Sequence, residues 1–212
     1  MFLNRRLYAS INEVIIWILQ KIIISHIENI DACRYPLLGQ EIHRTFGFQT
    51  EIKSLLQNVN FAYDLTRDQY HSTAILEKLA STSPSPTTKI VAITNVDLFI
   101  PILTHVYGEA QLAGKACILS TFRLQEGLSI TNIEKEFENR VVKEVLHELG
   151  HTFNLRHCND NTCIMHYCRS IKDVDRKSDQ LCRYCKILLK DELKRLEKKW
   201  FWSVLSRTGQ DQ

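Results

Sequence analysis

Three histidines and one glutamate lie in a short stretch of the chain with the types and spacing that a catalytic zinc ion requires. His147, Glu148 and His151 form a His-Glu-x-x-His pattern, and His157 follows six residues later. Because an α-helix completes a turn every ~3.6 residues, His147 and His151 would share one face and could bind one metal, with Glu148 beside the open coordination position. His157 cannot lie on that face, so the helix must end near Asn154 and the chain must turn back toward the metal.

This arrangement would support hydrolysis. Three neutral imidazoles leave one zinc position open for water, whose pKa the metal lowers toward neutrality. Glu148 would accept the water's proton as general base, and the hydroxide would attack a carbonyl that the zinc polarises. Peptide hydrolysis is the natural reaction of such a site. For the five-residue pattern alone, the alternative is an amphipathic helix with two surface histidines.

Cysteines crowd into the segment directly after His157. Five of the chain's seven cysteines lie there, at positions 158, 163, 168, 182 and 185. Such crowding beside histidines indicates metal binding. Spacing alone leaves the ligand set open, because Cys168 follows Cys163 at the same interval as Cys163 follows Cys158.

From His147 to Cys185 the sequence resembles the signature of the archaemetzincins, zinc metallopeptidases of the metzincin clan. That signature joins His-Glu-x-x-His-x-x-Gly-x-x-x-Cys to Cys-x-Met and then to Cys-x-x-Cys, and here the last two motifs are residues 163–165 and 182–185. Residues 67–72, 89–98 and 107–110 also look like segments of that family, as individually weaker signals.

Two departures from the family pattern leave every ligand in place. Asn154 stands where the family has glycine, and asparagine is the best non-glycine residue for the left-handed conformation expected at the helix end. The interval before Cys182 is one residue shorter than in the family, which we expect a loop to absorb.

The resemblance implies an α/β chain with a metzincin-like zincin fold: a mixed, mostly parallel sheet, an active-site helix and a small zinc-stapled C-terminal part. It implies two zinc ions per chain. The catalytic zinc would be held by three histidines: His147, His151 and His157. The structural zinc would be held by four cysteines: Cys158, Cys163, Cys182 and Cys185. Met165 would form the Met-turn, an apolar floor beneath the catalytic metal, and Cys168, Cys33 and Cys117 would be free thiols.

The elements that position these residues are expected to alternate. Strands are predicted at 14–24, 50–56, 89–94 and 116–122, with helical segments between them, which indicates a mostly parallel sheet. A central helix is predicted over 132–153, with a Thr131 and Glu134 capping box. Its core side is an apolar stripe: Ile133, Phe137, Val141, Val145, Leu149 and Phe153. Its polar face carries Glu144 and the histidines. Residues 186–207 predict a packing helix with Leu189, Leu193 and Leu196 on its apolar face, rather than a membrane-surface or nucleic-acid-binding helix.

Composition favours one globular domain. The chain has 212 residues, 44% of them hydrophobic and 24% charged, and we expect a single metallopeptidase domain, with an upper subdomain at 1–153 and a lower Cys-rich part at 154–212. A net charge of +3 is too small to indicate nucleic acid. The apolar run at 14–24 is too short, and too interrupted by Gln20 and Lys21, for a membrane span or signal segment. Thiolate ligands are typical of a reducing compartment, so we expect a cytoplasmic protein. We also expect a monomer.

The sequence therefore predicts a zinc-dependent metallopeptidase that acts on a peptide or protein, with no nucleic-acid or membrane partner. The substrate would lie extended along an edge strand in the region 99–116. An alternative is a zinc-stabilised binding module whose catalytic site is inactive or unoccupied, but Glu148 argues against it because a structural site has no use for a base. A Cys-rich nucleic-acid-binding protein would need interleaved aromatic and basic residues, which the cysteine segment lacks. His166 and Tyr167 are expected to be scaffold or solvent-facing residues.

Overall fold

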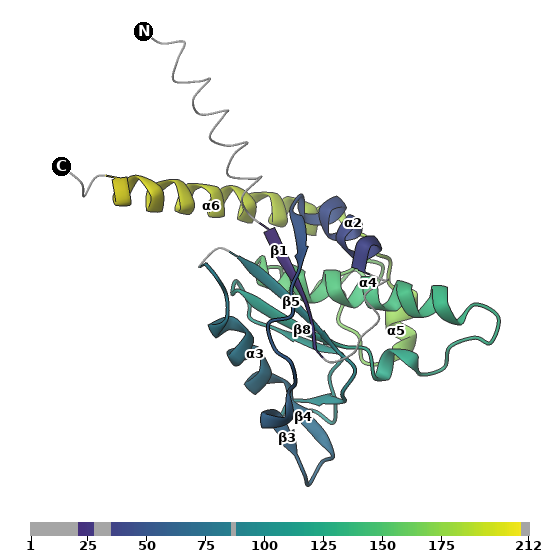
Figure 1. Cartoon of the computed structure of the whole chain (residues 1–212). Helices are drawn as coiled ribbons and strands as arrows, with labels where there is room; N and C mark the ends of the chain where they lie inside the picture. Colours follow the sequence, from purple (N-terminus) through teal and green to yellow (C-terminus); the bar gives the residue numbers. More distant parts are fainter. Residues whose placement is uncertain (1–20, 28–34, 86–87, 209–212) are drawn as a thin grey trace.

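The computed structural model describes residues 21–27, 35–85 and 88–208, and its centre is a five-stranded sheet in the order β2-β1-β5-β8-β7 (Figure 1). These strands are β1 (Lys21–His26), β2 (Gln49–Ile52), β5 (Lys89–Thr94), β7 (Gly108–Ala110) and β8 (Ala116–Ser120). All neighbouring pairs are parallel except β7, which runs antiparallel to β8 at one edge of the sheet. The expected mixed, mostly parallel sheet is confirmed.

The predicted strands agree with this sheet to different extents. The strand at 89–94 has the predicted bounds, that at 116–122 ends two residues early at Ser120, and that at 50–56 lies at Gln49–Ile52. Of the strand predicted at 14–24, residues 14–20 lie outside the described residues. The described part, β1, continues to His26.

Helices cover both faces of the sheet. On one face lie α2 (Tyr35–Phe46) and α4 (Ile133–Thr152), and on the other lies α3 (Ser72–Ser81) (Figure 1). Alternate residues of β5 serve the two sides: Val91 and Ile93 belong to the core shared with α2 and α4, whereas Ile90 and Ala92 belong to the core under α3. Because β5 and β8 are covered on both faces, their sequences are nearly continuous apolar runs.

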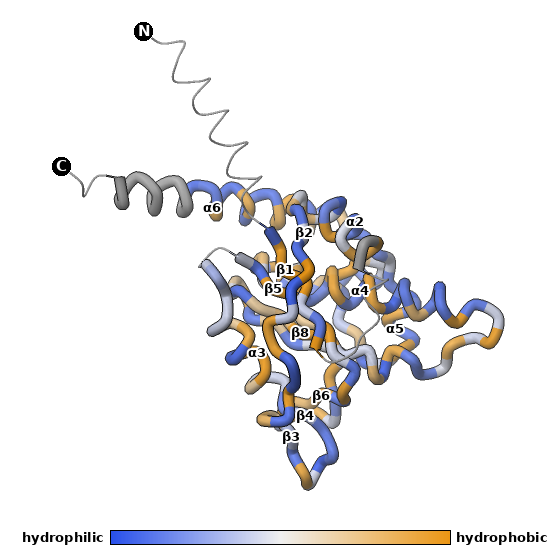
Figure 2. The backbone as a smooth tube through the Cα atoms, in the orientation of Figure 1, coloured by the Kyte–Doolittle hydropathy of each residue, from blue (hydrophilic) through white to orange (hydrophobic). Residues whose placement is uncertain are grey.

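The C-terminal part contributes α5 (Ile171–Arg176) and the long helix α6 (Arg183–Thr208), which extends beyond the sheet (Figure 1). Leu189, Leu193 and Leu196 of α6 pack on the core of α4, as the predicted packing helix requires. Figure 2 shows that hydrophobic residues concentrate in the central strands, whereas α6 alternates hydrophobic and hydrophilic segments. Among the described residues, none of the helices combines a membrane-spanning length with a sufficiently apolar sequence.

A second, three-stranded sheet lies at one end of the molecule (Figure 1). Its strands are β3 (Tyr63–Asp64), β4 (Gln69–His71) and β6 (Leu98–Phe99), preceded by the short 3₁₀ helix η2 (Asn60–Ala62). The strands β3 and β4 form a hairpin, and β4 pairs in parallel with β6. The segment after β6 leads into β7, the edge strand of the main sheet.

Helix α4 has nearly the predicted bounds but not the predicted cap. It begins after Asn132, which makes no side-chain cap hydrogen bond, so the capping box of Thr131 and Glu134 is wrong. The first-turn carboxylate of Glu136 instead accepts a hydrogen bond of 2.9 Å from the backbone N–H of Ser129. The apolar stripe is buried from Val141 onward, whereas Ile133 is exposed at the helix start and Phe137 is partly buried.

Candidate metal centre and catalytic cleft

The last two turns of α4 place His147 and His151 on one side, with their Nε2 atoms 3.2 Å apart. Two nitrogens bound at about 2.1 Å to one tetrahedral zinc ion lie about 3.4 Å apart. Backbone carbonyls orient both rings: Nδ1 of His147 lies 2.8 Å from the Ile164 oxygen, and Nδ1 of His151 lies 2.7 Å from the Leu155 oxygen. With each Nδ1–H donated to a carbonyl, each Nε2 is left with a lone pair for a metal.

A left-handed turn at Asn154 ends the helix and brings His157 back. Asn154 has φ +63°. The N–H of Leu155 donates to the Gly150 carbonyl at 3.0 Å and that of Asn154 to the His151 carbonyl at 2.9 Å, the paired bonds of a Schellman motif. The His157 ring then lies 5.4 Å from that of His147 and 4.9 Å from that of His151. The predicted helix end and left-handed Asn154 are confirmed, and the ligand atoms of the three histidines all lie within 4.8 Å of one another.

Burial keeps these imidazoles neutral. Burial, followed by the nearby Lys177 charge, holds the pKa of His147 well below its usual range. Burial also lowers the pKa of His151 to about 4 and lowers that of His157. The unprotonated form, which a metal needs, is therefore the resting form of all three at neutral pH.

Glu148 faces the same cleft from the neighbouring position of the helix. Its side chain is buried and packs against Gly108 of the edge strand, where a Cβ atom would lie only 2.7 Å from the Glu148 Cγ. Burial, and secondarily the charge of Glu144, raises the pKa of Glu148 well above its usual value. A carboxyl whose proton affinity is raised is suited to accept a proton.

Met165 lies beneath the end of the helix. It is fully buried, and a Cβ atom added to Gly150 would overlap its sulfur. The glycine of the His-Glu-Leu-Gly-His sequence therefore permits the close packing of the Met165 turn on the helix that carries the histidines.

Four cysteines converge in a second group, the predicted set of Cys158, Cys163, Cys182 and Cys185, with sulfurs within 4.8 Å of one another. Cys158 and Cys182 have sulfurs 3.8 Å apart. This separation is too long for a disulfide and equals the roughly 3.8 Å between thiolates bound at about 2.3 Å to tetrahedral zinc. Backbone N–H groups point at the Cys163 and Cys182 sulfurs. This donor set fits a closed thiolate metal site.

The other cysteines lie apart from this group. Cys168 lines the cleft, and burial raises the pKa of its thiol to about 11. Cys117 is a buried free thiol in the core, and Cys33 lies outside the described residues. The geometry thus favours Cys158 over Cys168 as the partner of Cys163.

A buried ion pair stands directly behind the histidines and was not anticipated from the sequence. The Lys177 ammonium lies 2.7 Å from the Glu144 carboxylate and 3.4 Å from Nδ1 of His147, and both charged side chains are almost fully buried. Burial lowers the pKa of Lys177, but the Glu144 carboxylate more than reverses this and the net pKa is raised. Glu144 was expected on the polar face of the helix, which is in fact buried here.

A cleft of about 650 Å³ runs along the edge strand β7 and past the three histidines and Glu148. Tyr167 lines it, with its ring 4.9 Å from that of His157. The ring of Tyr167 therefore belongs to the cleft wall, although part of it is solvent-exposed. His166 instead acts as scaffold, with Nδ1 lying 3.1 Å from the Cys158 carbonyl oxygen.

Comparison with known proteins identifies a family. The model of peptidase family M54 matches residues 48–191. The archaemetzincin of Methanopyrus kandleri is 40% identical over 172 residues, which cover 76% of this chain and 93% of that protein. The archaemetzincin of Halobacterium salinarum is 41% identical over 128 residues, covering 58% of this chain and 73% of that protein.

Solved structures of archaemetzincins are similar to this chain in fold. The crystal structure of the Methanopyrus kandleri archaemetzincin superposes with a TM-score of 0.71 at 30% identity, covering 82% of this chain and 96% of that one. That of the Archaeoglobus fulgidus archaemetzincin, complexed with malonate, gives 0.67 at 30% identity, covering 80% and 99%. The likeness therefore extends over both the sheet and the cysteine-containing part.

Proposed function

The chain belongs to peptidase family M54 and is a zinc metallopeptidase, and we propose that it hydrolyses peptide bonds with Glu148 as the general base. His147, His151 and His157 would hold the catalytic zinc. When bound, the metal would polarise the scissile carbonyl and lower the pKa of a water molecule. Glu148 would accept the proton of that water on its carboxylate and pass it to the leaving amine.

The shape of the cleft supports an extended polypeptide as substrate. The strand β7 lies at the sheet edge, and its residues line the cleft together with Glu148. A substrate that pairs with β7 as an additional strand would be held by backbone hydrogen bonds that do not depend on its sequence. Gly108 keeps this strand close to Glu148, because any side chain there would displace the carboxylate.

The approach of the histidine nitrogens to within 3.2 Å, beside a buried glutamate, carries this proposal. A zinc-stabilised binding module remains the competing function. It would need the metal-binding groups but not Glu148, whose burial costs free energy and has a use only if its carboxylate accepts a proton.

We also propose that the four cysteines hold a second, structural zinc, giving two ions per chain. Cys158 directly follows His157, so this metal would fix the loop that delivers the third histidine. The upper part would then comprise residues 1–153 and the lower part residues 154–212. A monomeric, cytoplasmic protein without nucleic-acid or membrane partners remains our expectation for its context.

A peptide library supplies the test of this function. The zinc-loaded protein should cleave at least one library peptide, a chelator should abolish the cleavage, and added zinc should restore it. The same treatment of the His157→Ala variant should give no restored cleavage. Complete absence of turnover by protein that carries its full zinc content would support the binding-module function instead.

A further inference from the structure

A group of exposed apolar side chains lies beside the cleft, on η2, on the hairpin of β3 and β4, and on the segment after β6. Leu65 at the tip of the hairpin is 83% exposed and Ile102 is 86% exposed, while Phe61 and Tyr63 are 55% and 41% exposed. Together with Pro101 we call these residues the hairpin patch. Scattered exposed apolar residues are normal, but neighbouring ones mark surfaces that bind another molecule.

Four residues of the hairpin patch border a shallow, open hollow. The hollow has a volume of about 540 Å³, and its walls include Phe61, Tyr63, Leu65 and Pro101. Phe99 also lines it, with its ring 5.3 Å from that of His71. The exposed apolar side chains and the aromatic ring suit contact with leucine, phenylalanine or valine, while Asp64 and His71 give the hollow a polar part.

Hydrogen bonds hold the backbone of the hairpin tip, where Leu65 is exposed. One carboxylate oxygen of Asp64 accepts hydrogen bonds from the N–H groups of Thr66 at 2.8 Å and Arg67 at 3.2 Å. The hydroxyl of Tyr63 donates to Asp68 at 2.6 Å. A partner that binds here would meet a turn already held by these bonds, which lowers the entropic cost of binding.

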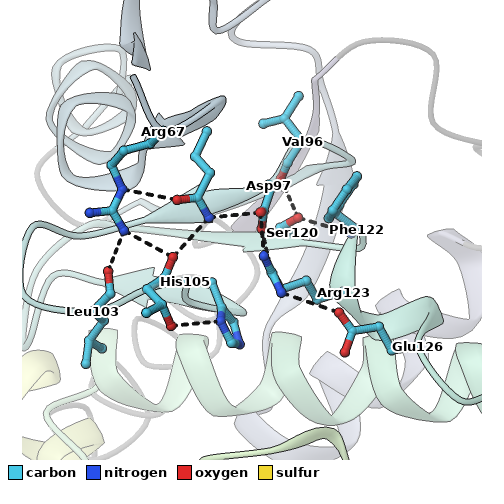
Figure 3. Close-up of polar contacts among 11 residues, drawn as sticks. Arg67, Val96, Asp97, Leu103, His105, Ser120, Phe122, Arg123 and Glu126 are labelled. Carbon is cyan, nitrogen blue, oxygen red and sulfur yellow. Dashed lines mark hydrogen bonds and ion pairs between the residues drawn. The ribbon is translucent and has the colours of Figure 1, made fainter. Parts of the chain in front are cut away.

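A polar network joins the hairpin to the wall of the cleft (Figure 3). Arg67 donates to the Leu103 and Thr104 carbonyls at 2.9 and 3.2 Å, and Gln69 donates to the Thr104 carbonyl at 3.0 Å and to Asp97 at 2.8 Å. Asp97 in turn accepts two hydrogen bonds of 2.7 Å from Arg123 (Figure 3). The segment between β6 and β7 is therefore fixed to the hairpin.

This fixed segment separates the hollow from the cleft. Ile100 and Leu103 line the cleft, whereas Phe99 and Pro101, their neighbours in sequence, line the hollow. A polypeptide that leaves the cleft over this segment would reach the hairpin patch within a few residues. The carboxylate lining the hollow, that of Asp64, accepts hydrogen bonds from its own turn.

We propose that the hairpin patch binds an apolar segment of the same polypeptide whose scissile bond lies in the cleft. The preferred substrates are then unfolded proteins or long peptides with an apolar segment outside the cleaved site. This inference rests on the proposed peptidase function, because the occupant of the patch is the substrate. It adds a second point of contact that short peptides do not use.

The experiment compares a short and a long substrate on two variants. The Phe61→Ser/Leu65→Ser double variant removes the patch, and Ile130→Ser, at a site 93% exposed and outside the patch, is the matched control. The short substrate is a library-derived octapeptide, which spans about 27 Å when extended, and the long one is β-casein, an unstructured protein. Labelled β-casein binding to the same variants in a Glu148→Gln background, followed by fluorescence anisotropy, gives a readout independent of turnover.

We expect kcat/KM for β-casein and its binding affinity each to fall about tenfold in the double variant, because the apolar contact is lost. The octapeptide should be cleaved within about twofold of the wild-type rate, and Ile130→Ser should change neither. Two results would overturn the proposal without affecting the peptidase function. In the double variant, kcat/KM could fall equally for both substrates, or the variant could cleave β-casein and the octapeptide as well as wild type does. If sedimentation velocity showed a dimer that only the double variant dissociates, the patch would be a self-association surface and the proposal would be wrong. Failure of the zinc-loaded wild-type protein to cleave either substrate would instead refute the peptidase function on which the proposal rests.

Discussion

Two backbone carbonyls decide which nitrogen each helix histidine offers. The Ile164 oxygen lies by Nδ1 of His147 and the Leu155 oxygen by Nδ1 of His151. Leu155 reaches this place because Asn154 adopts a positive φ directly before it. One residue conformation thus orients His151 and also returns the chain toward His157.

Substitution of Asn154 should therefore act on the metal site. Asn154→Gly should leave zinc affinity within about threefold of wild type, because glycine adopts positive φ freely. Asn154→Val should weaken zinc at the histidines by roughly tenfold or more, since a β-branched residue in this conformation costs about 1–3 kcal/mol. Competition with a chromophoric chelator would measure both, and a valine variant that binds zinc as tightly as the glycine variant would refute this role.

The histidines and Glu148 could be predicted from the sequence because their relation is local. Helical periodicity places His147 and His151, and the left-handed preference of asparagine places the turn before His157. Lys177 could not be predicted in this way, because it lies 30 residues from His147 and lysines are normally at the surface. The place of Tyr167 in the cleft likewise depends on tertiary packing against His157.

The Lys177–Glu144 pair connects α4 to the residue that follows α5. The two helices are also joined by Arg140, whose guanidinium donates two hydrogen bonds to Asp175. Both links cross from the helix of the histidines to the lower, cysteine-containing part. They supply the rigidity that a metal site between two segments requires.

Removal of Lys177 should destabilise the fold strongly. Lys177→Met leaves Glu144 buried without its partner, and breaking a buried pair in this way costs about 3–5 kcal/mol. The Lys177→Met/Glu144→Met double variant should recover much of that loss, because no uncompensated charge is left. Urea unfolding of the metal-free proteins measures both; a single variant as stable as wild type would mean that the pair contributes nothing to the fold.

The elements themselves could be predicted where burial dominates the pattern. Residues 89–94 form a strand with the predicted bounds because β5 is covered on both faces. The start of α4 was misjudged, since Glu136 binds Ser129 and the capping box does not form. The small sheet was not predicted, because its strands of two or three residues carry no periodicity, and Gln69 and Asp97 meet only in the folded chain.

Across the whole molecule, the two metal-binding groups share no residue but meet at consecutive positions, His157 and Cys158. The histidine group opens to the cleft, whereas the cysteine group lies at the start of α6, which carries Cys185. A closed thiolate site is typical of structural zinc and an open three-histidine site of catalytic zinc. The two ions should therefore differ in accessibility and in their effect on stability.

Metal counting by elemental analysis tests this division. The wild-type protein should contain two zinc ions per chain, and His147→Ala and Cys182→Ser should each lose about one. Cys182→Ser should in addition lower the melting temperature of the protein, because a structural zinc contributes folding free energy. A single zinc in the wild-type protein, unchanged by His147→Ala, would remove support for the catalytic site.

The Glu148→Gln variant distinguishes a general base from a metal ligand at this position. Glutamine keeps the size and polarity of the side chain but cannot accept the proton from water. Zinc content should equal that of wild type, while cleavage of the library-derived peptide should fall by roughly a hundred- to ten-thousand-fold. Cleavage at the wild-type rate by Glu148→Gln with its full zinc content would contradict the mechanism.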